Sequence, residues 1–170
     1  PRVAPQMIGL GLVESIHPAD ILHQADPDDA NGDGISGKPS MVRDPKTQGL
    51  VLGRFGWKAS TSTIRAQSAD AFAGDIGISS PDAMRPYGDC TQRQSECLAR
   101  QTGIQSKLGD SEAPSPVLDL VAFYSRNLAV PARRDVEAPQ VLHGKKLFYE
   151  AGCIACHTPK YVTRRDAEQP

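Results

Sequence analysis

The pentapeptide Cys153-Ile154-Ala155-Cys156-His157 limits the possible folds of this chain more narrowly than any other segment. Two thiols three positions apart can reach the two vinyl groups on one porphyrin edge, and the following imidazole can bind the iron. A chain of this composition contains such a motif by chance with a frequency of about 0.002. The spacing therefore predicts covalent attachment of haem c through Cys153 and Cys156, with His157 as an axial iron ligand.

Three other interpretations of the two thiols stay open. A thiol–disulfide oxidoreductase places its Cys-x-x-Cys pair at the start of a helix, whose N-terminus lowers the thiol pKa. Here the pair follows a predicted helix, 140–151, that ends in Ala-Gly. A zinc site needs a second cysteine pair at ligand spacing, and Cys90 and Cys97 are poorly spaced for that. A local disulfide is the third alternative.

The hydrophobic pattern predicts a fold that is mainly α with long irregular loops. Apolar residues recur at helical spacing over 4–16, 18–25, 62–73, 117–128 and 140–151. The segments 26–49 and 79–113 are polar and rich in turn-forming residues. For the helix over 117–128, we expect the buried face to consist of Leu118, Val121, Ala122, Phe123 and Tyr124.

The remaining local expectations concern single residues. The stretch 50–57 is predicted to be extended or turning, with Phe55 and Trp57 in the core. Gly152 is expected to end the last helix in a left-handed cap. The two histidines that flank the short helix 18–25, His17 and His23, are predicted to cap it or lie at the surface.

The predicted domain organisation has three parts. Residues 1–130 form a helical, loop-rich module, and residues 131–139 form a Pro-rich linker. A cytochrome c-like haem segment then begins at the C-terminal end, over residues 140–170, and is expected to be incomplete.

The net charge and the length of the apolar runs argue against two classes of protein. The chain has 19 Lys and Arg against 20 Asp and Glu, a net charge of -1, without the basic excess typical of nucleic-acid-binding proteins. No apolar run approaches the roughly 18 residues that a membrane span requires.

The other two cysteines are Cys90 and Cys97. Because haem c is attached outside the cytoplasm, we expect an exported protein in an oxidising compartment. That setting favours a disulfide between Cys90 and Cys97, which would close a short loop. Two free thiols are the alternative.

The acidic segment 26–37 contains the pattern Asp29-x-Asn31-x-Asp33-Gly34, which matches the first half of an EF-hand calcium loop. Position 12 of such a loop is Ser40 here, where a bidentate Glu is expected. The pattern therefore predicts a single structural Ca²⁺ site with Asp29, Asn31 and Asp33 as ligands. Weaker candidate ligands are Asp26, Asp28 and Ser36. A turn loop without metal is the alternative.

Six blocks in the same order together resemble the bacterial di-haem oxidoreductases, a family of di-haem peroxidases that are often labelled thiol oxidoreductases. The resemblance covers nearly the whole chain, through the segments 4–12, 26–37, 53–59, 71–78, 128–134 and 144–159. It implies a periplasmic c-type cytochrome enzyme with one electron-transferring haem and one catalytic haem. On this chain the family's attachment motif corresponds to Cys153, Cys156 and His157.

The resemblance also implies that this chain corresponds to the central part of such a protein. Only 13 residues follow His157, so we expect the chain alone to be inactive, and this form need not carry haem. The sequence identifies no catalytic residue. The expected partners are an electron-transfer protein or a small oxidant such as peroxide, together with the remainder of the parent chain. The alternative functions are a calcium-stabilised structural or binding module without catalysis of its own, and a Cys-x-x-Cys thiol–disulfide oxidoreductase.

Overall fold

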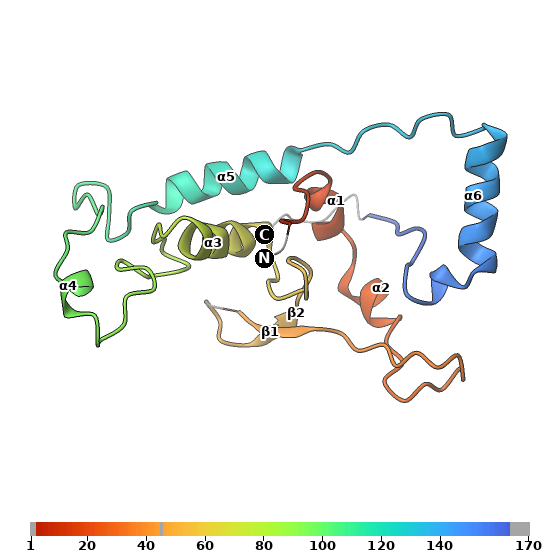
Figure 1. Ribbon diagram of the computed structural model, residues 1–170, viewed down its shortest axis with the longest axis horizontal. Coiled ribbons are helices and arrows are strands. Elements are labelled where there is room, and N and C mark those ends of the chain that lie inside the picture. Colours follow the sequence, from red (N-terminus) through yellow and green to blue (C-terminus); the bar gives the residue numbers. More distant parts are fainter. Residues whose placement is uncertain (1–2, 45, 164–170) are drawn as a thin grey trace. The chain divides into compact units, whose positions relative to one another are not determined.

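The computed structural model describes residues 3–44 and 46–163 (Figure 1). It confirms a mainly helical chain with long loops. In chain order its elements are α1 (Leu10–Glu14), α2 (Pro18–Leu22), β1 (Met41–Arg43), β2 (Leu50–Leu52), α3 (Ile64–Asp75), α4 (Ser95–Leu98), α5 (Ser115–Asn127), α6 (Pro139–Glu150) and the 3₁₀ turn η1 (Cys153–Ala155).

The chain forms two compact units, each built from two separate stretches of sequence. Within the described residues, the first unit comprises 3–14 and 40–128, and the second comprises 15–39 and 129–163. The domain boundary at 131–139 stays a prediction.

The core of the first unit lies where α1, α3 and α5 pack together. Phe55, Ile64 and Ala122 are buried there, and Leu10 and Val13 pack against them. The helix α3 begins at Ile64 because the Thr63 Oγ1 accepts a hydrogen bond from the Ala66 amide, at 3.0 Å.

Three core predictions for this unit are wrong. Trp57 is exposed, and its Nε1 donates to the Val3 carbonyl oxygen at 3.0 Å. On α5, Phe123 and Tyr124 are exposed, whereas Leu118 and Ala122 are buried together with Ser125. Because α5 carries apolar side chains on more than one face, its spacing alone does not select the face that packs on α3.

Two elements in the N-terminal half differ from the predicted secondary structure. The helix expected over 4–16 is only the five-residue α1, because Gly9 adopts a positive φ of 76° immediately before it. The segment expected to be a loop contains β1, which pairs with β2 as an antiparallel hairpin with Val42 opposite Val51.

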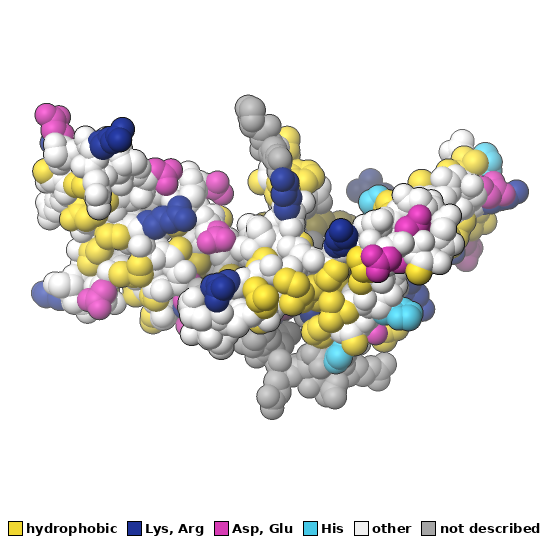
Figure 2. Space-filling view, turned by 90° about the horizontal axis from the view of Figure 1, so that it is seen from below, with side chains coloured by type: hydrophobic (Ala, Val, Ile, Leu, Met, Phe, Trp, Pro, Cys, Tyr) yellow, Lys and Arg dark blue, Asp and Glu magenta, His cyan; other side chains and the backbone are white. Residues whose placement is uncertain are grey.

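The second unit holds α2, α6 and η1. Ile16 and Thr163 form an isolated antiparallel bridge, and so do Asp26 and Gly37. No helix of the described chain is long and apolar enough to cross a membrane. In the space-filling view, hydrophobic side chains are spread over the visible surface among charged ones (Figure 2).

Candidate functional site

The Cys-x-x-Cys-His motif follows α6 directly, and its geometry is set by the end of that helix. Gly152 has φ 74° and ψ 12°, the left-handed conformation predicted for it, which glycine adopts without steric penalty. The chain then turns through η1, where the amides of Cys156 and His157 both donate to the Cys153 carbonyl oxygen, at 3.3 and 2.9 Å. The motif is therefore held in a compact turn.

The side chains of the motif are free to react. Cys153 and Cys156 are exposed free thiols, and His157 is exposed as well. The Phe148 ring of α6 lies 6.4 Å from the imidazole of His157, centroid to centroid, at an interplanar angle of 50°. Two uncommitted thiols and one accessible imidazole within five residues are the donor set that covalent haem attachment requires, so the residues present fit the group.

Two cavities of the second unit lie near the motif. The first, of about 350 Å³, is lined by Cys156 with some of its neighbours and by residues of the segment 21–39. The second, of about 630 Å³, is lined by the α6 residues Val141, Gly144 and Phe148 and by part of the chain after the motif. No cysteine of the motif lines the larger cavity, whereas the thiol-bearing Cys156 lines the smaller one.

The acidic segment 26–37 folds through hydrogen bonds between its side chains and its own backbone. The two carboxylate oxygens of Asp26 accept from the amides of Ala30 and Asn31, at 2.8 and 3.2 Å. Both carboxylate oxygens of Asp29 accept from the Gly34 amide at 3.1 Å. These are the local contacts with which Asp and Asn stabilise turns.

The other predicted calcium ligands make similar contacts. The Asn31 Oδ1 accepts from the Asp33 amide at 2.8 Å, and the Asp33 Oδ1 accepts from the Ile35 amide at 2.9 Å. Asp28 and Ser36 are exposed in the same loop. Among the described residues, no three His, Cys, Asp or Glu side chains come together as a metal site. The calcium prediction therefore has no support, and these contacts favour the turn loop without metal.

The structure joins Cys90 and Cys97 in a disulfide, with their Cα atoms 5.9 Å apart, and Cys97 lies in the short helix α4. Glu112 joins the two ends of the segment 79–103, which contains this disulfide. Its carboxylate accepts from the Ser79 amide at 2.8 Å and from the Gly103 amide at 2.9 Å. The hydrogen bond from the Ser79 amide is the main cause that holds the pKa of Glu112 below its usual value.

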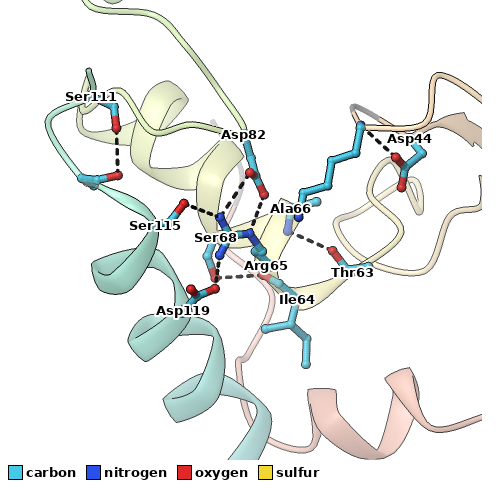
Figure 3. A network of polar contacts seen from close by, with 12 residues as sticks. Asp44, Thr63, Ile64, Arg65, Ala66, Ser68, Asp82, Ser111, Ser115 and Asp119 are labelled. Atoms are coloured by element: carbon cyan, nitrogen blue, oxygen red, sulfur yellow. Dashed lines mark hydrogen bonds and ion pairs between the residues drawn. The ribbon is translucent and has the colours of Figure 1, made fainter. Parts of the chain in front are cut away.

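A charged cluster around Arg65 was not predicted from the sequence (Figure 3). The Arg65 Nε lies 2.7 Å from Asp82 Oδ2, and its Nη2 lies 3.2 Å from Asp82 Oδ1. A second ion pair joins Arg65 to Asp119 on α5. The hydrogen bond to Asp82 raises the pKa of Arg65. Since these partners are 17 and 54 positions away in the sequence, no local pattern could identify them.

His17 and His23 flank α2, as the sequence predicts. His17 is the N-cap of α2, where its Nδ1 accepts from the Ala19 amide at 3.0 Å, and His23 is the C-cap. Capping of α2 by His17 is thus confirmed.

Comparison with known proteins identifies a family. A family model described as "Di-haem oxidoreductase, putative peroxidase" matches residues 1–169. No curated protein and no solved structure matches the chain.

Proposed function

The chain belongs to the di-haem oxidoreductase family, and from this premise we propose that it supplies one covalent haem-binding segment to an exported electron-transfer enzyme. The observation that carries the proposal is the arrangement of the Cys-x-x-Cys-His motif. Its two thiols are free and exposed, and the imidazole of His157 follows them directly beyond a helix that ends at Gly152.

Each residue of the motif has a distinct role in this proposal. Cys153 and Cys156 would hold the porphyrin through thioether bonds, and the imidazole of His157 would be a ligand of the iron. The haem supplies reversible one-electron chemistry at the iron when it is bound. The turn in which the Cys153 carbonyl oxygen accepts from two amides keeps the thiols and the imidazole in one compact group.

Peroxide reduction is the finer part of the proposal. Reducing one peroxide molecule to two waters consumes two electrons and two protons. An electron-transfer protein is the proposed source of the electrons. The family description, which names a peroxidase, supports this choice of oxidant.

The proposed location is the periplasm or another exported compartment. Haem c attachment belongs to that setting, and the disulfide between Cys90 and Cys97 is compatible with it.

A pyridine haemochrome spectrum of the full-length protein, made in a host that matures c-type cytochromes, tests the attachment. We expect a covalent c-type spectrum whose intensity falls when Cys153 and Cys156 are both changed to Ser. The matched pair Cys90→Ser with Cys97→Ser should keep it. Haem that is extracted completely by acidic organic solvent would contradict the proposal.

The thiol–disulfide alternative is tested with the same protein in an insulin-reduction assay. Thioether formation consumes both thiols, so we expect no reduction of insulin by the wild-type holoprotein. Catalytic reduction that disappears in Cys156→Ser would favour the alternative.

A further inference from the structure

We infer that residues 21–39, including the acidic loop, form one wall of the haem pocket, and that Lys38 lies beside the porphyrin. The inference rests on the proposed function, because it assumes that haem is bonded to Cys156. It assigns a role to a segment for which the sequence predicted a calcium site.

Cys156 lies at a cavity of the second unit. It lines the cavity of about 350 Å³, a size within the range of ligand pockets. A group bonded to the Cys156 Sγ therefore lies at or in this cavity. Neither cysteine of the motif lines the larger cavity beside α6. A haem bonded to Cys156 is therefore not expected in that cavity.

The part of the cavity wall that comes from residues 21–39 includes apolar side chains that suit a porphyrin ring. They are Ile21, Ala25, Ile35 and Pro39, which line the wall together with Gln24, Gly37 and Lys38. These residues belong to the same compact unit as the motif. The bridge between Ile16 and Thr163 joins the two stretches of that unit.

The charge of the cavity wall also suits haem. Among the described residues that line this cavity, Lys38 carries the one charged side chain. Haem brings two propionate carboxylates, and a Lys ammonium is a suitable partner for one of them. No Asp or Glu of the described residues lines the cavity, although the adjacent loop is acidic. The reason is that Asp26 and Asp29 direct their oxygens to the loop's own amides.

The acidic loop thus helps to form the wall of this pocket. The Asp26 amide donates to the Gly37 carbonyl oxygen at 2.9 Å, which closes the loop next to the wall. A Cβ on Gly37 would lie 3.1 Å from the Gln24 carbonyl oxygen, so the close approach favours glycine there. Closure of the loop places Ile35 and Lys38 at the cavity.

The test measures the reduction potential of the covalently bound haem in the full-length holoprotein. Lys38→Gln removes a positive charge near the iron, stabilises the ferric state, and is expected to lower the potential. Lys38→Arg should keep it. The matched control is Lys160→Gln, since Lys160 lines the larger cavity.

A second pair of variants tests the apolar wall. Ile35→Glu should lower the potential further and change the Soret absorption, whereas Leu22→Glu, at an exposed position of α2 outside the cavity wall, should do neither. Two results would overturn the inferred pocket wall alone, provided that the haem is covalently bound. In the first, neither Lys38→Gln nor Ile35→Glu changes the reduction potential. In the second, only Lys160→Gln changes it. Wild-type protein without covalent haem would overturn the proposed function together with it.

Discussion

Glu14 and Arg126 are 112 positions apart in the sequence, and the Arg126 Nε lies 2.7 Å from the Glu14 Oε2. The other carboxylate oxygen of Glu14 accepts from the Ile64 amide at 2.9 Å, at the start of α3. Both side chains of the pair are largely buried, at 7 % exposed for Glu14 and 14 % for Arg126. Glu14 therefore ties α1 to both α3 and α5.

Glu14→Gln tests the contribution of the Glu14 ion pair to stability. The amide can still accept from Ile64, but Arg126 keeps its charge in a buried place without a carboxylate. We expect a loss of about 3 kcal/mol in the free energy of unfolding, measured by urea denaturation. Glu150→Gln is the control, because the Glu150–Lys146 pair is exposed and contributes at most about 0.5 kcal/mol. Equal stability of Glu14→Gln and wild type would contradict the role of Glu14.

The two aspartates that pair with Arg65 should contribute differently to the free energy of unfolding. The Asp82 side chain is 9 % exposed, whereas the Asp119 side chain is 64 % exposed. We expect Asp82→Asn to reduce the free energy of unfolding by about 2 kcal/mol and Asp119→Asn by less than about 1 kcal/mol. Thermal or urea denaturation measures both, and a larger effect at Asp119 would contradict the assignment.

Glu112 should make stability depend on pH. Hydrogen bonds, the one from the Ser79 amide first, lower its pKa in the folded chain. A carboxylate with a lowered folded pKa stabilises the fold above its unfolded pKa, and that contribution is lost as pH falls through the folded pKa. The melting temperature of wild type should therefore drop more between neutral and acidic pH than that of Glu112→Gln. Parallel pH profiles for the two proteins would contradict this prediction.

The acidic loop should depend on its own hydrogen bonds. Asp26→Ala removes the acceptors of the Ala30 and Asn31 amides and is expected to destabilise the chain by about 1 kcal/mol. Asp28→Ala, at an exposed neighbouring position, is the control and should cause a smaller loss. In calorimetry, added Ca²⁺ should produce no binding heat. Heat that is lost in Asp29→Asn would restore the calcium site.

Local sequence patterns were sufficient for the features that depend on local chemistry. The motif around Cys153 is recognised by its spacing, and the left-handed Gly152 follows from its place after α6. Helical spacing located α3, α5 and α6 to within about two residues.

Features that depend on distant partners could not be predicted in the same way. The α5 spacing admits several buried faces, and only packing against α1 and α3 leaves Phe123 and Tyr124 outside. The ion-pair partners of Arg65 and Glu14 are distant in the sequence and are brought close only by the tertiary fold. For the acidic loop, the same Asp and Asn pattern suits either Ca²⁺ or backbone amides, and its hydrogen bonds favour the amides.

The central claim is that the thiols of Cys153 and Cys156 carry haem. Mass spectrometry of the proteolytic peptide that contains residues 153–157, taken from mature full-length protein, tests it most directly. We predict that this peptide carries the mass of one haem and that neither of its cysteines reacts with an alkylating reagent. A bare peptide in which both cysteines are alkylated, or are joined to each other, would contradict the account.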